Sequence, residues 1–163
     1  MKKKALHIVR HGKSSWKYEN IMDYDRPLKN RGIKNNYSIA EKISSFVQVD
    51  LIISSPAVRA LHTATIFARV LDLPLSDLAL SDVLYASHEE VVYNFLTNLD
   101  NEHNQVMVVG HNPTLTNLAN RFIAEPIDNI PTSGCVSIKF DVDDWGAIEE
   151  TQVKTVHFTV PEK

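Results

Sequence analysis

Short runs of consecutive apolar residues recur along this chain, separated by longer stretches in which apolar and polar residues are mixed. The clearest runs lie at residues 5–9, 51–53 and 106–109. Unbroken apolar runs of this length are typical of strands that are buried on both faces, as in a parallel sheet. Two later segments, 135–140 and 153–160, predict a final pair of strands joined as a hairpin around residues 143–146.

Between the strands, apolar residues recur at three- and four-residue spacings that predict amphipathic helices. One helix is expected over residues 33–46, after a long loop over residues 10–28 that is rich in turn-forming residues. Three more helices are expected after typical start signals, which are Ser55–Pro56, the capping pattern Ser87–Glu90, and Asn112–Pro113. The predicted stripe of the second helix contains Val58, Leu61, Thr65, Ala68 and Leu71.

Strands that alternate with helices predict an α/β fold with a mainly parallel sheet, and the final hairpin would add an antiparallel edge. The 163 residues fit a single domain that spans 1–163. Apolar residues make up 44% of the chain and charged residues 23%. This ordinary globular composition excludes a disordered chain, a coiled-coil rod and a collagen-like fibre.

The charge balance and the single cysteine narrow the classes of partner and compartment. Seventeen Lys and Arg against twenty Asp and Glu give a net charge of −3, which argues against nucleic acid as a partner. The chain has no run of 18 apolar residues, so no membrane span is expected. Cys135 cannot form an internal disulfide, which favours a reducing compartment, and we expect a cytoplasmic protein. The oligomeric state stays open.

Basic side chains follow each of the three buried strands at the point where the strand ends. Arg10 and His11 follow the first strand, Arg59 lies shortly after the second, and His111 follows the third. The carboxyl ends of parallel strands meet at one edge of a sheet, where open α/β folds form their sites. We therefore expect two histidines and two arginines to converge from distant parts of the sequence.

These residue types suit a phosphoryl group. A guanidinium offers a rigid fork of donors that matches phosphate oxygens, and the predicted helix starts near Ser55 and Asn112 would present free N–H groups to an anion. A neutral histidine nitrogen can attack phosphorus and form a phosphoramidate that water then hydrolyses. Neighbouring arginine charges favour that neutral form, and Gly12 would let the backbone approach a ligand.

Three segments together resemble the histidine phosphatase superfamily, and within it the SixA-type phosphohistidine phosphatases. They are Ile8-Val9-Arg10-His11-Gly12-Lys13-Ser14, Ser54-Ser55-Pro56-Ala57-Val58-Arg59-Ala60-Leu61-His62-Thr63-Ala64 and Val109-Gly110-His111-Asn112-Pro113. Asp25-Arg26-Pro27-Leu28 also fits the SixA-type branch. The resemblance covers about residues 5–140 and implies the phosphoglycerate mutase-like fold, a three-layer α/β/α sandwich.

The resemblance also implies roles for particular residues. His11 would be the nucleophile that becomes phosphorylated, Arg10 and Arg59 would bind phosphate oxygens, and His111 would complete the pocket and stabilise the transferred group. Gly12, Ser14 and Arg26 are further candidates for substrate binding. No cofactor is implied, and the arginines would neutralise phosphate charge without a metal. No cysteine pattern suggests a metal site either.

Several positions keep two interpretations. Lys13, Ser14 and Lys17 depart from the mutase-type motif, which argues against phosphoglycerate mutase chemistry. Glu89 or Glu90 could be a general acid, or both could belong to an exposed helix start. Arg26 could contact substrate or cap the next helix. Trp16 and Tyr18 could form the rim of the pocket, although packing is favoured for Trp16. His62 could support Arg59, and Asp23 and Asp25 are interpreted as turn residues.

The favoured function is a metal-independent phosphatase that acts on phosphohistidine in a protein. The chain leaves little room for an insertion that covers the pocket, which suits a phosphorylated side chain on a protein surface. Imidazole is also a better leaving group than a sugar alkoxide and depends less on a general acid. The alternatives are a phosphatase for small metabolites such as sugar phosphates and a phosphate-binding module without turnover. An intact His11 argues against the binding module.

Overall fold

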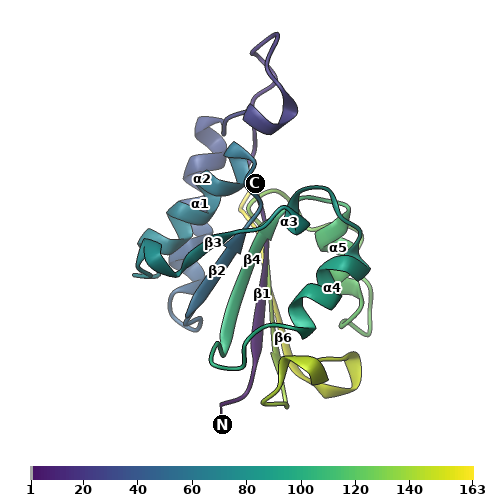
Figure 1. The fold of residues 1–163 in the computed structure, drawn as a ribbon. Coiled ribbons are helices and arrows are strands. Elements are labelled where there is room, and N and C mark those ends of the chain that lie inside the picture. Colours follow the sequence, from purple (N-terminus) through teal and green to yellow (C-terminus); the bar gives the residue numbers. More distant parts are fainter. Residues whose placement is uncertain (1) are drawn as a thin grey trace.

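A six-stranded sheet lies between two layers of helices in the computed structural model, which describes residues 2–163 (Figure 1). The strands are β1 (Ala5–Arg10), β2 (Leu51–Ser54), β3 (Leu78–Leu80), β4 (Gln105–Gly110), β5 (Cys135–Phe140) and β6 (Val153–Thr159). Their order across the sheet is β3-β2-β4-β1-β5-β6. Neighbours from β3 to β1 pair in parallel, whereas β5 and β6 are antiparallel to their neighbours. The predicted mainly parallel sheet with an antiparallel edge is confirmed.

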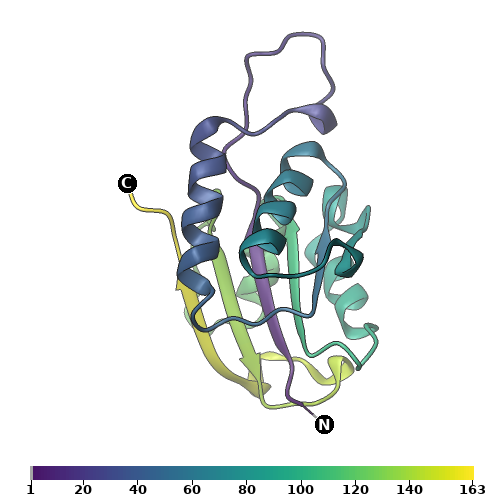
Figure 2. The ribbon, with the colours of Figure 1, turned by 90° about the vertical axis from the view of Figure 1, so that its left-hand side faces the viewer.

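Helices cover both faces of this sheet. They are α1 (Asn30–Ile43), α2 (Val58–Val70), α3 (Val83–Ala86), α4 (Glu89–Thr97) and α5 (Thr114–Asn120). Figure 2 shows α1 and α2 in front of one face, and Figure 1 shows α4 and α5 on the other. The predicted three-layer sandwich is therefore present. No helix within residues 2–163 is long and apolar enough to cross a membrane.

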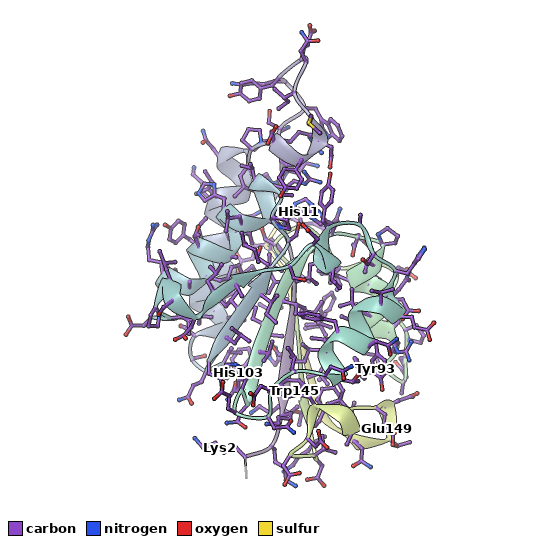
Figure 3. The ribbon with its side chains drawn as sticks, viewed as in Figure 1. Lys2, His11, Tyr93, His103, Trp145 and Glu149 are labelled. Atoms are coloured by element: carbon purple, nitrogen blue, oxygen red, sulfur yellow. The ribbon has the colours of Figure 1, made fainter. Side chains whose placement is uncertain are left out.

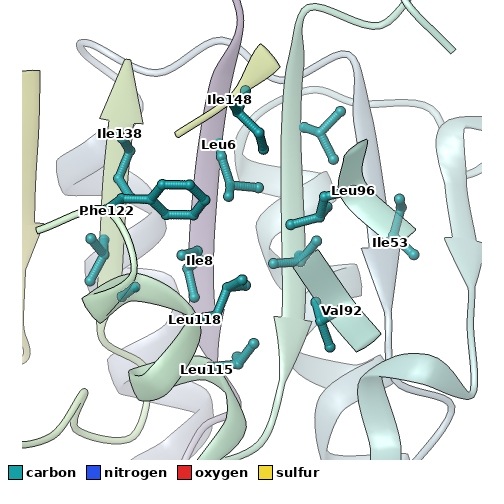
Figure 4. Packing of buried hydrophobic residues seen from close by; sticks show 14 of the residues in the cluster. Leu6, Ile8, Ile53, Val92, Leu96, Leu115, Leu118, Phe122, Ile138 and Ile148 are labelled. Atoms are coloured by element: carbon teal, nitrogen blue, oxygen red, sulfur yellow. The ribbon is translucent and has the colours of Figure 1, made fainter. Parts of the chain in front are cut away.

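Two apolar clusters hold the layers together. Leu6 and Ile8 of β1 pack with Leu118 and Phe122 on the α4–α5 side (Figure 4). Val9 faces the opposite way and packs with α1 and α2. Side chains alternate between the two faces of a strand, so one apolar run in β1 supplies both clusters. This explains why apolar residues occupy both faces of the strand, with His7 as the exception within residues 5–9.

The buried face of α2 differs from the predicted stripe. Val58 is exposed, whereas Ala60, Ala64 and Phe67 are fully buried. Helices α1 and α2 pack against each other, and the two small alanine side chains permit this approach because they add little bulk between the helices. The apolar spacing of the sequence also missed β3 and α3, which are only three and four residues long.

Two predicted helix starts are also corrected. Helix α2 begins at Val58, and Ser55 Oγ instead accepts the Ala57 N–H at 3.2 Å, ahead of the helix. His88 precedes α4 without a side-chain cap, so the capping box predicted at Ser87 is absent. Asn112 does act as predicted, because its side-chain oxygen accepts the Thr116 N–H at 3.1 Å at the start of α5.

Candidate active site

The carboxyl ends of β1, β2 and β4 bring together the four side chains singled out from the sequence. The rings of His11 and His111 have their centroids 5.0 Å apart. Arg59 Nη2 lies 3.5 Å from His111 Nδ1. Arg10 and Arg59 line the same cleft as His11. Figure 3 places His11 at the end of the sheet from which the loop after β1 projects. The predicted convergence is therefore observed.

His11 is held in one orientation by the residue that follows it. Its Nδ1 donates to the Gly12 carbonyl at 2.7 Å, which assigns the proton to Nδ1 and leaves the Nε2 lone pair free. Burial lowers the pKa of His11 to about 4, and the charges of Arg59, Arg10 and Arg26 add to this against the Gly12 hydrogen bond. At neutral pH His11 is therefore an uncharged imidazole in a cationic cleft.

His111 is also held neutral. Its Nε2 lies 2.8 Å from Ser55 Oγ, and its Nδ1 faces Arg59. Because a guanidinium only donates, this arrangement assigns the ring proton to Nε2, which donates to the hydroxyl. Burial lowers the pKa of His111 to about 3, assisted by His11 and Arg59 and opposed by Asp23. Ser55, expected to cap a helix, instead orients this ring.

The arginines keep donors for an anion. Arg10 Nη1 donates to the Ile130 carbonyl at 3.0 Å, and burial lowers the pKa of Arg10. The Nε–H groups of Arg10 and Arg59 are both buried and have no partner within residues 2–163. Buried donors are nearly always hydrogen-bonded in folded proteins, and charged ones are the costliest to leave unpaired. This pair of free donors therefore points to a bound anion.

The cleft in front of His11 has a volume of about 180 Å³. Its cationic lining comprises Arg10, Lys13, Arg26 and Arg59. Arg26 Nη2 donates to Ser14 Oγ at 2.7 Å, and its guanidinium stacks 3.2 Å from the centre of the Trp16 ring. Arg26 thus lies at the cleft with Ser14, and does not cap α1, whose first turn follows Lys29. Trp16 is 75% exposed, so the expectation that it packs inside the fold is wrong.

Gly12 serves a different purpose from the one predicted. Its N–H donates to Thr63 Oγ1 at 3.0 Å, so this group is not free for a ligand. A Cβ at Gly12 would lie 2.8 Å from the Asn36 amide nitrogen and 3.0 Å from the Gly32 carbonyl. Glycine is therefore required because α1 packs closely against the chain here, and the Gly12 carbonyl holds His11.

Asp23 is a site residue that the sequence reasoning missed. Arg59 Nη2 donates to its carboxylate at 2.9 Å, and Arg26 Nη1 at 3.1 Å. The Tyr85 hydroxyl donates to it at 3.1 Å. Burial opposes its ionisation, yet the hydrogen bonds from Arg59, Arg26 and Tyr85 lower the pKa of Asp23 to about 2. Its position three residues before Arg26 could have indicated an ion pair with that arginine, but Asp25 is also an acidic residue close to Arg26, and the sequence does not distinguish the two.

Other candidates lie outside this network. Glu89 forms an ion pair with Arg121 at 3.0 Å, and Glu90 is exposed, so neither hydrogen-bonds to the histidines or arginines of the site. His62 is exposed and does not support Arg59. Thr63 contacts Arg59 instead, because its hydroxyl donates a hydrogen bond to the Arg59 carbonyl at 2.8 Å. Residues 2–163 contain no cluster of His, Cys, Asp or Glu suited to a metal ion.

Comparisons with known proteins agree with this geometry. Residues 6–82 match the family model of the histidine phosphatase superfamily (branch 1). A SixA protein from Agrobacterium tumefaciens, assigned as a phosphohistidine phosphatase, is 24% identical with a TM-score of 0.83, covering 99% of this chain and 100% of its own. The protein histidine phosphatase SixA complexed with tungstate is 23% identical with a TM-score of 0.75, covering 95% and 94%.

A metabolite phosphatase has the same fold. The mycobacterial glucosyl-3-phosphoglycerate phosphatase is 15% identical with a TM-score of 0.61, covering 98% of each chain. A search of curated proteins found no match. The matched segment of residues 6–82 contains His11 and Arg59, and the shared phosphoglycerate mutase-like fold extends over the whole chain. Residues 6–82 are thus similar to the histidine phosphatase superfamily, and the chain as a whole shares the fold of the SixA proteins.

Proposed function

We propose that this phosphatase removes the phosphoryl group from phosphohistidine on a protein, with His11 as the nucleophile. The observation that carries the proposal is the state of His11. Its Nε2 is free and uncharged, beside two arginines whose buried Nε–H groups lack a partner. A binding module without turnover is disfavoured, because a protonated histidine would hold a phosphate better than a neutral one.

In the first step, His11 Nε2 attacks phosphorus while the bond from phosphorus to the substrate imidazole breaks, and the leaving nitrogen takes a proton from water. In the second step, water attacks phosphorus, the His11 nitrogen–phosphorus bond breaks, and inorganic phosphate leaves. Arg10, Arg59 and Arg26 balance the charge of the transferred group. His111 keeps Arg59 and the ring of His11 in place.

The leaving group supports phosphohistidine as substrate. Asp23 is the carboxylate bonded to the site arginines, and its pKa of about 2 keeps it ionised and unable to donate a proton. Glu89 is engaged with Arg121. A poor leaving group such as a sugar alkoxide needs a general acid, whereas an imidazole needs it much less. The cleft of about 180 Å³ is also smaller than common small-molecule sites of about 300–1,000 Å³.

The alternative is a phosphatase for a small phosphate ester. It is favoured by one observation, the shared fold of the mycobacterial glucosyl-3-phosphoglycerate phosphatase. The two substrates are separated by kcat/KM for a phosphohistidine protein, an aryl phosphate and a panel of sugar phosphates. We expect the first two to exceed every sugar phosphate. A kcat/KM of about 10⁵ M⁻¹s⁻¹ for a sugar phosphate is an ordinary value for an enzyme. If a sugar phosphate reached this value and the phosphohistidine protein were not hydrolysed, the substrate would be a small phosphate ester instead.

The role of His11 is tested with ³²P-labelled phosphohistidine protein, quenched without acid in the presence of EDTA. We expect label on His11 in the wild-type protein and loss of turnover in His11→Ala, with His62→Ala, a change at an exposed histidine, as the matched control. Label on Ser14, or an active His11→Ala, would disprove the mechanism. If EDTA abolished turnover and a divalent ion restored it, the arginines alone would not be sufficient to neutralise the charge of the phosphoryl group.

A further inference from the structure

Exposed apolar side chains gather on the segment between β1 and α1. Trp16 and Met22 are 75% and 72% exposed, and Tyr18 and Ile21 are 50% and 40% exposed. Figures 1 and 2 show this segment projecting from the body of the molecule, at the end of the sheet where His11 lies in Figure 3. Isolated exposed apolar residues are common, but a contiguous group beside a site marks an interaction surface.

The base of this segment forms a groove of about 490 Å³, which we call the loop groove. Its walls are residues 15–18 on one side and residues 27–30 on the other. Lys17 and Lys29 line it, and neither forms an ion pair with a carboxylate within residues 2–163. The groove therefore combines aromatic and apolar surface with two uncompensated positive charges.

The loop groove adjoins the phosphate cleft. Trp16 belongs to the lining of both. Its ring stacks on Arg26, which bonds to Ser14 and Asp23 in the cleft. A chain whose phosphorylated side chain enters the cleft would therefore lay its neighbouring residues beside Trp16, toward Tyr18 and the two lysines.

We propose that the loop groove docks the protein substrate through an acidic side chain that lies next to an apolar one, close to the phosphohistidine. This inference rests on the proposed function. The cleft is lined mainly by cationic side chains suited to the phosphoryl group, so contacts that distinguish one phosphoprotein from another are expected outside it. The unpaired lysines complement an acidic side chain, and the aromatic wall complements an apolar one.

Docking of this kind acts on binding and leaves the phosphoryl transfer step unchanged. A contact made equally in the ground state and the transition state lowers KM without raising kcat. Loss of the contacts between one carboxylate and the two exposed lysines should lower kcat/KM by up to about 30-fold, and about 10-fold is expected. The effect should be absent for free phosphohistidine, which does not reach the groove.

The test uses histidine peptides phosphorylated with phosphoramidate. One peptide has glutamate and leucine beside the phosphohistidine, a second has lysine in place of glutamate, and free phosphohistidine is the minimal substrate. For the wild-type protein, we expect the acidic peptide to have about 10-fold higher kcat/KM than the lysine peptide. The Lys17→Glu/Lys29→Glu double variant should reverse this preference through KM, with free phosphohistidine turned over as in wild type.

Matched controls separate the groove from general surface effects. Lys2→Glu/Lys154→Glu makes the same charge change at exposed lysines outside the groove, and should keep the wild-type preference. Tyr18→Ala should raise KM for the acidic peptide, whereas Leu75→Ala, at another exposed apolar residue, should leave it unchanged. A preference that the groove variants leave unchanged would overturn the docking site while the proposed function stands.

The remaining outcomes identify other occupants or a failure of the function itself. Sedimentation with anionic lipid vesicles and a concentration series of the sedimentation coefficient measure binding to a lipid surface and self-association. Dependence of either on Lys17 and Tyr18, without a peptide preference, would overturn the proposal in favour of that occupant. If the wild-type protein hydrolyses neither peptide nor free phosphohistidine but does hydrolyse sugar phosphates, the proposed function fails first.

Discussion

At the scale of single residues, the site depends on keeping a histidine neutral among positive charges. Two features act together on His11: burial lowers its pKa, and the Gly12 carbonyl selects the tautomer. A charged imidazole would have no lone pair at Nε2 and could not attack phosphorus. In the proposed mechanism, the arginines that would bind the transferred group thus also help to keep His11 in its reactive form.

The protonation state of His11 is directly measurable. We expect its ring resonances in a ¹⁵N NMR titration to stay those of the neutral Nδ1–H tautomer from pH 8 to pH 5, with a midpoint near pH 4. An ordinary histidine has its midpoint near about 6.5. Loss of the Arg59 charge in Arg59→Gln should raise the midpoint of His11. A midpoint near 6.5 in the wild-type protein would contradict the assigned state.

Arg59 is expected to tolerate no conservative replacement. Its two terminal nitrogens donate to the backbone and carboxylate of Asp23, and its Nε–H stays free for phosphate. Arg59→Lys keeps the charge but replaces the rigid fork by a point charge, so we expect about a 10²-fold loss in kcat. Arg69→Lys on the exposed side of α2 is the control. Near wild-type kinetics for Arg59→Lys would place it outside the phosphate site.

At the scale of elements, the segment from β1 to α1 connects the nucleophile to the substrate-facing surface. It begins at His11, returns through Ser14 and Leu28 in an isolated antiparallel bridge, and enters α1 at Asn30. Gly32 lies where the first turn of α1 crosses this segment. A Cβ there would lie 2.3 Å from the Lys13 carbonyl oxygen and 2.7 Å from its nitrogen. Because the Lys13 atoms nearest to this Cβ belong to the backbone, no flexible side chain could move aside to make room for it.

Gly32→Ala therefore tests the packing of α1 against the catalytic segment. Alanine favours a helix by about 1 kcal/mol over glycine, but overpacking against the Lys13 backbone costs about 1–3 kcal/mol or more. We expect a lower midpoint of urea denaturation and a larger loss of kcat than of KM, because His11 is displaced. Lys34→Ala, an exposed position of the same helix, should be stable and active. A more stable Gly32→Ala protein would refute the contact.

At the scale of the whole molecule, three parallel strand ends create the site, and two helix layers bury the sheet that carries it. The same burial makes the fold sensitive to acid, because three histidines are held neutral inside it. Burial lowers the pKa of His7 to about 4, and the pKa values of His11 and His111 lie at about 4 and about 3. Their ordinary value in the unfolded chain is about 6.5.

Stability is therefore expected to fall as the pH decreases from 6.5 to about 4. In that window the unfolded chain binds more protons than the folded one, which lowers the free energy of unfolding. For His7 this loss is on the order of 2 kcal/mol between pH 7 and pH 5. Urea midpoints at both values measure it, and His7→Gln should lose less stability than wild type over the same interval. Equal losses in both proteins would contradict the role of His7.

The local pattern of the sequence determined much of this protein. Short, largely apolar runs predicted β1, β2 and β4, since a strand buried on both faces is mostly apolar. The residues after those strands then predicted where His11, Arg59 and His111 meet, because parallel strands share one carboxyl edge. Short elements such as β3 carry too few residues for a periodic signal, and they escaped prediction.

Only the tertiary structure decided which polar atoms pair across the site. Asp23 and Asp25 are indistinguishable as turn residues in the sequence, and the path of the loop alone puts Asp23 against Arg59 and Arg26. Ser55 was predicted to cap a helix, yet its hydroxyl orients His111, since helix α2 begins three residues later. Hydrogen bonds depend on distances of a few tenths of an ångström between residues far apart in the chain, and sequence spacing carries no such information.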